Sequence, residues 1–291
     1  MSSDPFLRAG LSADQVPPDF VVDQRYEAYS AADHETWSRL HRRQAELLRG
    51  RVCGEFFAGL DALGIAADGI PDFKAMNRVL KAATGWEVVA VPGLVPDRVF
   101  FGHLAARRFP AGFWIRRPDE FDYIEEPDIF HDVFGHVPLL MNKAYADFVA
   151  AYGEAGLRLS DPADLARLAR LYWYSVEFGL IETAAGLRIF GAGIASSPGE
   201  TLFALESASP HRIGFDPVRV MRTRYRIDDY QQSYFVLPGF EAMPALDEAS
   251  LAPAMAQAAA RAEIDPSVVL PRDAVVSRGD GSHHVAAKIA S

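Results

Sequence analysis

The chain has 291 residues, of which 49% are hydrophobic and 23% charged, a balance typical of a globular protein with a sizeable core. Its formal net charge of -10 disfavours nucleic acid and anionic membrane surfaces as partners, because both require clustered lysines and arginines. Cys53 is the only cysteine, which excludes an intramolecular disulfide and a cysteine-based metal site and fits a cytoplasmic, reducing compartment. We find no secretory leader and no run of about 18 apolar residues, so we expect neither export nor a membrane span.

The first 115 residues are predicted to form an arm, two helices and two strands. Residues 1–30 are punctuated by proline and aspartate and are expected to lie as an extended arm over a domain. Apolar residues recur every three to four positions over residues 33–63, which predicts one long amphipathic helix. A second helix is expected over residues 71–84, and β-prone runs predict short strands over residues 86–91 and 109–115.

A short apolar segment that follows contains two of the eight histidines, His131 and His136. Pro127 at its start and Gly135 near its end predict a helix over about residues 127–135. On a straight α-helix the spacing of five would splay the two imidazoles by about 140°, and we expect the glycine to let the second one turn back. Such a density of histidines indicates a metal site. The alternative is a pair of core histidines hydrogen-bonded to backbone.

A carboxylate is expected to be buried further along the chain. Helices are predicted over residues 143–157 and 162–184, and Glu177 lies in an apolar run of the second one. A buried carboxylate requires a partner or a metal ion. Two imidazoles and one carboxylate on one side of an ion are typical of non-haem Fe(II) enzymes that activate O2.

The C-terminal third is predicted to alternate between short strands and helices, ending in a flexible tail over residues 266–291. Ser197 is expected to cap a helix together with Glu200, which leaves Ser196 as the freer hydroxyl. The remaining elements are strands over residues 187–190 and 233–237, a short helix after Asp216 and an alanine-rich helix over residues 246–263. Four further histidines are expected to be exposed and without a function: His34, His41, His283 and His284.

Three motifs in this order, at residues 127–140, 172–179 and 191–200, resemble the catalytic domain of the pterin-dependent aromatic amino acid hydroxylases, and most closely its bacterial members. A weaker similarity extends over about residues 85–240. The resemblance implies an α+β, mainly α fold, in which short β-strands surround a metal-binding helical core. It implies one catalytic domain over residues 31–265, between the arm of residues 1–30 and the tail of residues 266–291.

The resemblance also implies the chemistry and its residues. Fe(II) would be bound by His131, His136 and Glu177, with a tetrahydropterin as electron donor, O2 as co-substrate and L-phenylalanine hydroxylated to L-tyrosine. Ile124 stands where animal relatives carry a hydroxyl, so one substrate contact is not expected here. Implied pterin contacts are Gly93, Leu94, Val95, Phe100, Asp132, Ala169 and Tyr172, and implied substrate contacts are Arg116, Pro127, Trp173, Phe178, Gly193 and Ser196.

Other functions stay open alongside this one. Hydroxylation of tyrosine or tryptophan on the same scaffold is one alternative, and a non-catalytic metal-binding relative is another. A zinc hydrolase is disfavoured because its usual helix has two histidines four residues apart with a glutamate after the first, whereas Asp132 follows His131 here. We expect a cytoplasmic monomer in phenylalanine catabolism, in a cell that also contains a pterin-recycling dehydratase.

Overall fold

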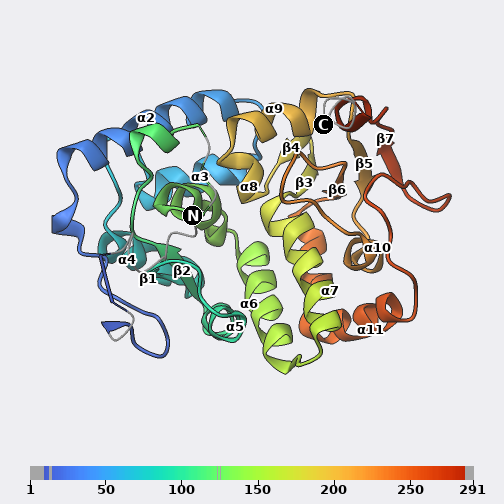
Figure 1. Ribbon diagram of the computed structural model, residues 1–291, viewed down its shortest axis with the longest axis horizontal. Helices are drawn as coiled ribbons and strands as arrows, with labels where there is room; N and C mark the ends of the chain where they lie inside the picture. The colour runs from blue at the N-terminus through green and yellow to red at the C-terminus, as the bar shows by residue number, and fades with distance from the viewer. Residues whose placement is uncertain (1–9, 13–14, 123, 125, 286–291) are drawn as a thin grey trace. The chain divides into compact units, whose positions relative to one another are not determined.

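The structure is a computed structural model that describes residues 10–12, 15–122, 124 and 126–285. The chain forms two compact units (Figure 1). The first consists of Met1–Arg49 and Gly54–Leu157, and the second of Gly50–Cys53 and Arg158–Ser291. Each unit contains its own sheet and its own helices, so the expected mixture of helices and short strands is present in both.

Among the described residues of the first unit, three α-helices precede the first strand, where the sequence predicted two. Helix α2 (Ala31–Leu48) begins with a capping box between Ser30 and Asp33. The predicted single helix over residues 33–63 is wrong, because the chain turns at Gly50, whose φ of 71° an α-helix cannot continue, and resumes as α3 (Gly54–Leu63). Helix α4 (Phe73–Thr84) matches the second predicted helix and ends at Gly85.

The sheet of the first unit is a parallel pair made by strands β1 (Glu87–Val91) and β2 (Arg108–Gly112). Helix α5 (Asp97–Ala105) connects them, as a parallel pair requires a crossover. Both predicted strands are therefore present, although β2 is shorter than predicted. The remaining elements of this unit are η2 (Tyr26–Ala28), η3 (Pro118–Glu120), η4 (Phe130–His136), η5 (Val137–Met141) and α6 (Lys143–Arg158).

The second unit contains a five-stranded sheet in the order β4-β3-β6-β5-β7. The hairpin of β3 (Leu180–Thr183) and β4 (Gly186–Ile189) is antiparallel, whereas β6 (Ser233–Leu237) runs parallel to both β3 and β5 (His211–Gly214). All five residues of β6 are buried, in line with its central position. The predicted strands over residues 187–190 and 233–237 are confirmed to within one residue.

The helices of the second unit are shorter than the sequence predicted. Helix α7 (Pro162–Tyr172) gives way to a π-helical turn, η6 (Trp173–Glu177), and then to β3, so the predicted helix over residues 162–184 is wrong in its last third. Apolar residues continue through all three elements, which is why the periodicity alone did not reveal the end of the helix. The other helices are α8 (Ala192–Ala195), α9 (Pro198–Glu206), α10 (Pro217–Arg222), η7 (Phe240–Leu246) and α11 (Glu248–Ala259).

The described part of the predicted tail packs into the second unit. Strand β7 (Val275–Ser277) pairs antiparallel with β5, and the side chain of His284 is 4% exposed. The expectation that His284 is exposed is therefore wrong. His34 and His41 are half-buried and also hydrogen-bonded, since His34 Nδ1 accepts from the Ile70 amide and His41 Nε2 lies 3.2 Å from the Ile65 carbonyl oxygen.

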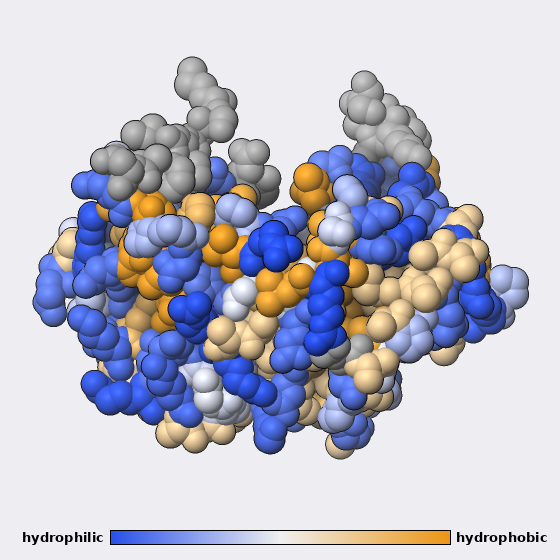
Figure 2. Space-filling view, turned by 90° about the horizontal axis from the view of Figure 1, so that it is seen from below, coloured by the Kyte–Doolittle hydropathy of each residue, from blue (hydrophilic) through white to orange (hydrophobic). Residues whose placement is uncertain are grey.

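On the face drawn in Figure 2, hydrophobic residues are interspersed among hydrophilic ones. The large apolar side chains exposed among the described residues are spread along the chain, and only Val275 and Val276 are sequence neighbours. Within residues 10–285, leaving aside the few positions that are not described, no helix is both long and apolar enough to cross a bilayer.

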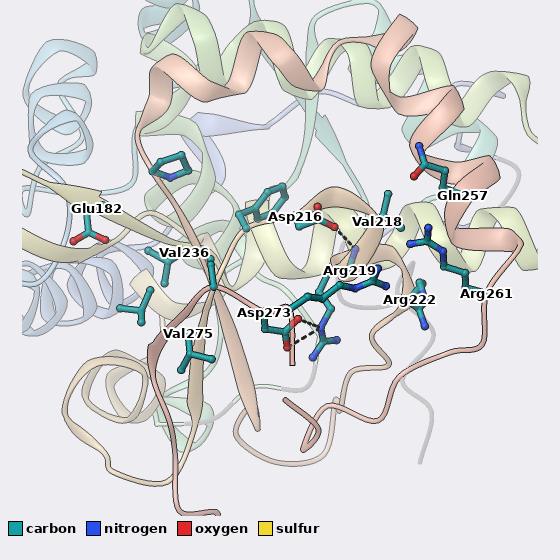
Figure 3. Close-up of a pocket in the computed structure, with 16 residues that line it drawn as sticks. Glu182, Asp216, Val218, Arg219, Arg222, Val236, Gln257, Arg261, Asp273 and Val275 are labelled. Carbon is teal, nitrogen blue, oxygen red and sulfur yellow. Dashed lines mark hydrogen bonds and ion pairs between the residues drawn. The ribbon is translucent and has the colours of Figure 1, made fainter. Parts of the chain in front are cut away.

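A surface pocket of about 640 Å³ lies in the second unit (Figure 3). Its lining includes the buried ion pair of Arg219 with Asp273, at 3.0 Å. Arg222 and Arg261 line the same pocket. Since none of the predicted site residues lines it, we do not assign the predicted chemistry to this pocket.

Candidate iron and pterin site

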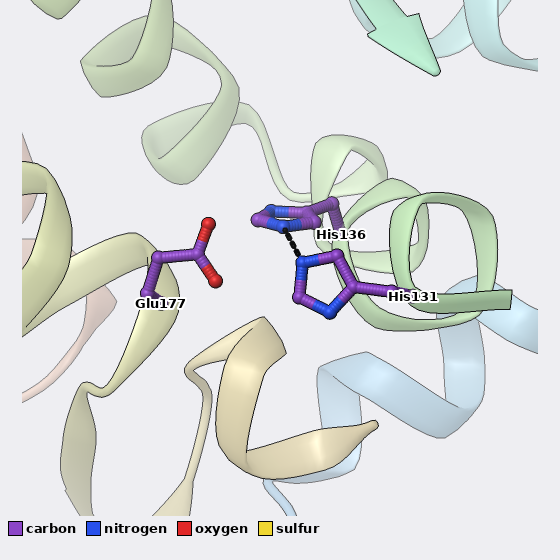
Figure 4. Close-up of side chains that lie close together, drawn as sticks. All are labelled: His131, His136 and Glu177. Atoms are coloured by element: carbon purple, nitrogen blue, oxygen red, sulfur yellow. Dashed lines mark hydrogen bonds between the residues drawn. The ribbon is translucent and has the colours of Figure 1, made fainter. Parts of the chain in front are cut away.

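Two of the three expected iron ligands come from one short element, η4. This segment is a π-helix, in which the backbone hydrogen bonds connect residues five apart and so bring such residues to the same face. The Nε2 atoms of His131 and His136 consequently lie 3.2 Å from each other (Figure 4). The prediction that Gly135 turns the second imidazole back is therefore corrected: the wider helix aligns the two rings.

Aromatic packing holds η4 in place. Phe130 and Phe134, four residues apart, stack on one another with ring centroids 4.6 Å apart. Trp37 of α2 meets Phe130 edge to face, and Phe56 of α3 meets Phe134 in the same way, both with centroids 5.5 Å apart. These rings are fully buried, and each such pair contributes about 0.5–1.5 kcal/mol beyond the area that it buries. The rest of the first unit thus supports the two histidines.

A buried carboxylate fixes the start of the same helix. Asp128 is completely buried and accepts a hydrogen bond from the His131 amide at 3.0 Å. It also accepts two bonds from the Arg116 guanidinium, from Nε and from Nη2, both at 2.8 Å. The pairing of Asp128 with Arg116 was not predicted from the sequence. The other edge of the guanidinium has no protein partner among the described residues.

The separation of the two imidazole nitrogens fits a metal ion. Two neutral imidazoles can share at most one proton between their Nε2 atoms, whereas an ion bound at about 2.0–2.1 Å from each nitrogen at a right angle would hold them about 3 Å apart. The observed distance of 3.2 Å is close to that value. The ring of His136 also packs against Phe109 of β2, with centroids 5.0 Å apart. The pair therefore fits two neighbouring positions on one metal ion.

The third expected ligand, Glu177, is the last residue of η6 in the second unit. It is half-buried, where the sequence suggested full burial. Gly193 of α8 packs against it so closely that a β-carbon at this position would lie 3.2 Å from the Glu177 carboxylate and 2.9 Å from the Phe178 ring. A side chain at residue 193 would therefore disturb the carboxylate, which gives the predicted site residue Gly193 a steric reason. Figure 4 draws the side chain of Glu177 together with the two imidazoles.

Aromatic residues surround η6 within the second unit. Trp173 stacks on Tyr225 with centroids 4.2 Å apart, and its other neighbour is Phe178 at 4.5 Å. The indole Nε1 of Trp173 donates to Gln231 Oε1 at 3.0 Å. The positions of Tyr225 and Gln231 beside Trp173 were not foreseen, because they lie more than fifty residues along the chain. Trp173 is thus held on both of its faces and at its edge.

The residues expected to bind the pterin are divided between the two units. In the first unit, Gly93, Leu94 and Val95 lie in the turn after β1, where Leu94 is 69% exposed, and Phe100 is half-buried in α5. The carboxylate of Asp132 accepts a hydrogen bond from the Gly112 amide at 2.7 Å, which fixes it beside the end of β2. The two residues in the second unit, Ala169 and Tyr172, are half-buried near the end of α7.

The two remaining substrate candidates are Pro127 and Ser196. Pro127 is half-buried directly before Asp128. Ser196 is buried, and its hydroxyl donates to the Ala192 carbonyl at 2.9 Å, so it is less free than the sequence suggested. The predicted cap is confirmed, since Ser197 Oγ accepts from the Glu200 amide. The Glu200 side chain does not close the expected capping box and instead accepts a hydrogen bond from Tyr234.

This architecture and these donors match a known family. The sequence model of the biopterin-dependent aromatic amino acid hydroxylases matches residues 24–248, and the chain belongs to this family. The phenylalanine-4-hydroxylase of Caulobacter vibrioides is 53% identical over 280 residues, which cover 95% of this chain and 95% of the relative.

Solved structures of one bacterial relative are similar along the whole fold. Phenylalanine hydroxylase from Chromobacterium violaceum with bound iron(III) and 7,8-dihydrobiopterin has a TM-score of 0.88 and 51% identity, and covers 95% of this chain and 100% of that chain. The same enzyme with bound iron and phenylalanine has a TM-score of 0.85 and 50% identity, with 94% and 100% covered. The predicted α+β, mainly α fold and the predicted family are therefore confirmed.

Proposed function

We propose that this protein is a non-haem iron, tetrahydropterin-dependent monooxygenase that hydroxylates L-phenylalanine to L-tyrosine. The observation that carries the proposal is the pair of imidazole nitrogens that η4 holds 3.2 Å apart, within a member of the biopterin-dependent family. The relatives named above are phenylalanine hydroxylases by name, and structures of the Chromobacterium violaceum enzyme contain iron with 7,8-dihydrobiopterin or iron with phenylalanine.

We propose His131, His136 and Glu177 as the ligands of Fe(II). Two neutral imidazoles and one carboxylate are the donors of the facial arrangement that leaves further coordination positions open. Bound iron and the reduced pterin would together supply the electrons that activate O2, which reacts slowly with closed-shell organic molecules on its own. The task of the three side chains is to hold the ion; Asp128 and Gly193 orient two of them.

We assign the pterin to the turn of Gly93, Leu94 and Val95, with Phe100, Asp132, Ala169 and Tyr172 as further contacts. Support comes from the exposure of Leu94 and from the Gly112 amide that fixes the Asp132 carboxylate. A carboxylate held in this way can accept hydrogen bonds from the N–H groups of a pterin ring. An aromatic side chain such as Phe100 can cover the face of that ring.

For the substrate we propose that Arg116 binds the carboxylate of the amino acid. Asp128 occupies one edge of the guanidinium and orients the other, which matches a carboxylate with two parallel hydrogen bonds. Trp173 and Phe178, with Pro127, Gly193 and Ser196, would surround the ring of the substrate. Because Trp173 is fixed by Tyr225 and Gln231, it leaves less room for an indole than for a single six-membered ring. Phenylalanine is therefore favoured over tryptophan.

The test is to incubate the iron-loaded protein with a reduced pterin, O2 and each aromatic amino acid in turn. We expect tyrosine to form from phenylalanine, with the highest kcat/KM of the three substrates. A tyrosine or tryptophan hydroxylase would reverse this order, and a non-catalytic relative would bind iron without forming any product.

The division into an arm of residues 1–30, a catalytic domain of residues 31–265 and a tail of residues 266–291 belongs to the same proposal. So does a cytoplasmic monomer in phenylalanine catabolism, working beside a pterin-recycling dehydratase. The scattered distribution of exposed apolar side chains among the described residues supports the monomer. Sedimentation of the purified protein tests it, and a stable tetramer would contradict it.

A further inference from the structure

A second pair of histidines lies in the second unit, close to a carboxylate that the proposed hydroxylation does not use. Asp229 lies in the loop after α10, and His283 and His284 lie in the segment after β7. His283 Nε2 is 2.8 Å from Asp229 Oδ1, and His284 Nδ1 is 3.3 Å from Asp229 Oδ2. One donor atom from each of the three residues lies within 4.8 Å of the others. Three donors separated by 54 and 55 residues in sequence therefore converge through the fold.

Backbone hydrogen bonds hold the segment that carries the two histidines. The Gly279 amide donates to His211 Nδ1 at 2.8 Å, and the Gly281 amide donates to the Ser209 carbonyl at 3.0 Å. The His283 amide donates to Ser209 Oγ at 3.1 Å. These bonds fix the backbone of the segment, and the contacts with Asp229 orient the two rings, so both rings are positioned before any ligand arrives. When the donors are already positioned, less side-chain entropy is lost on binding an ion.

Aromatic residues shield one side of the cluster. Phe203 and Tyr230 stack on one another with centroids 4.5 Å apart, and the ring of His283 lies 5.2 Å from Phe203. The side chain of His284 is 4% exposed, whereas that of His283 is 35% exposed. An ion could therefore enter from the side of His283, and a water molecule could complete its coordination there. The shielded side has a lower dielectric constant, which strengthens the attraction between a cation and the carboxylate.

We propose that Asp229, His283 and His284 form a second metal site, for a divalent ion of the zinc type. Zinc binds imidazole nitrogen and carboxylate oxygen at about 2.0–2.2 Å in a tetrahedron, which places neighbouring donors about 3.3 Å apart. The observed separations are 2.8 Å from His283 Nε2 to Asp229 Oδ1 and 3.3 Å from His284 Nδ1 to Asp229 Oδ2, so each imidazole lies within about half an ångström of that spacing from one oxygen of the carboxylate. Three protein donors with one open position match the common three-ligand zinc arrangement. The ion would replace the two protons that the imidazoles now share with Asp229.

The site has a structural consequence for the loop of residues 225–231. Tyr225 at its start stacks on Trp173, and Gln231 at its end accepts the hydrogen bond from the Trp173 indole. Asp229 lies between these two anchors, so an ion at Asp229 would link this loop to the segment after β7. We infer that metal binding orders the loop that supports Trp173. The competing explanation is a hydrogen-bonded cluster that never binds metal.

The experiment counts metal on the intact, iron-loaded protein. Zinc is added in excess, loosely bound zinc is removed by dialysis, and total iron plus zinc per chain is measured. We expect two equivalents for the natural sequence and one for Asp229→Asn, His283→Ala and His284→Ala. The matched control is Asp228→Asn, which removes the neighbouring, exposed carboxylate and should retain two equivalents.

A variant at the first site separates this inference from the proposed function. Glu177→Ala should lose the first equivalent and retain the second, while His283→Ala should do the opposite. His283 is partly exposed, so its variant stays informative even if the buried His284→Ala fails to fold. Hydrogen exchange should slow in peptides over residues 225–231 and 279–285 when zinc is added. Equal metal content in the natural sequence and in Asp229→Asn and His283→Ala would overturn the proposal, and so would unchanged exchange in both peptides.

Discussion

The two histidine pairs of this protein, His131 with His136 and His283 with His284, differ in what their carboxylate does. Asp128 binds the backbone amide of His131 and the Arg116 guanidinium, and leaves both Nε2 atoms of its pair directed at one another. Asp229 instead accepts hydrogen bonds from the two imidazoles themselves.

This difference predicts unequal dependence on metal. In η4 two nitrogen acceptors meet at 3.2 Å, and a cation satisfies them better than a single shared proton does. In the second pair the carboxylate already satisfies one nitrogen of each ring, so the cluster is complete without an ion. Burial lowers the pKa of His284 in spite of its acidic partner, which favours the neutral ring. The first pair should therefore require a metal for its function, and the second should only accept one.

The sharpest way to break the comparison is to remove one histidine from each pair. His131→Ala should lower kcat by at least about a thousandfold, or about 4 kcal/mol in activation free energy, because a proposed iron ligand is lost. His283→Ala should leave iron content and the hydroxylation rate nearly unchanged. Iron analysis and the rate of tyrosine formation, measured on both variants, check this. Equal losses in the two variants would mean that the pairs do not differ as described.

The two carboxylates should differ in their contribution to stability. Asp128→Asn leaves the buried Arg116 guanidinium without its counter-charge, which should cost about 3–5 kcal/mol in the free energy of unfolding. Asp229→Asn removes an acceptor from two imidazoles at a partly exposed position and should cost only about 1 kcal/mol. Urea unfolding followed by circular dichroism measures both values. A smaller loss for Asp128→Asn than for Asp229→Asn would be inconsistent with the geometry.

The Arg116 side chain distinguishes the first region as the proposed substrate-binding region. Arg116→Ala should lower kcat/KM for phenylalanine, mostly through KM, because the proposed bidentate contact to the substrate carboxylate is lost. The change corresponds to about 2–4 kcal/mol in transition-state stabilisation. Arg117→Ala, one residue along the chain and more exposed, is the control and should leave KM unchanged. Steady-state kinetics below the melting temperature of each variant decide the matter, and an unchanged KM in Arg116→Ala would rule out this role.

Glu200, which lies near Asp229 and His283, should make the stability of the second region depend on pH. Burial raises the pKa of Glu200 to about 7, although the hydrogen bond from Tyr234 opposes the shift. Because the fold favours the protonated acid, the stability that it contributes is present below about pH 4.5 and is lost as the pH rises through about 7. Glu200→Gln stays neutral at every pH and should be more stable than the natural protein at pH 8, by about 2–3 kcal/mol. Unfolding at pH 5 and at pH 8 tests this, and the two proteins should differ less at pH 5.

Features that depend on neighbouring residues were predicted correctly from the sequence, whereas contacts between residues far apart in the chain were not predicted. The strand over residues 233–237, the cap at Ser197 and the family motifs all depend on neighbours in the chain, and each was predicted. The pairing of Arg116 with Asp128 spans 12 residues, and that of Asp229 with His283 spans 54, so no periodic pattern marks either.

The π-helical geometry around the predicted ligands could not be predicted from the sequence for a similar reason. The composition of residues 130–136 does not distinguish a π-helix from an α-helix. In the structure this segment is a π-helix that packs against Trp37 and Phe56. The end of α7 was hidden because apolar residues continue into η6 and β3. Glu177 was identified because it is the only charged residue in that apolar run, but its partial exposure was not predicted.

The π-helix of η4 also has a consequence for the evolution of this segment. A single π-turn is equivalent to an α-helix that has gained one residue, so the alignment of His131 with His136 depends on the number of residues between them as well as on their identity. Apolar replacements that preserve volume at Val133 should be accepted. Deleting any one residue between the histidines should restore α-helical spacing for everything that follows and displace η5 along with it. Drift in this segment should therefore occur by substitution, while insertions and deletions are eliminated.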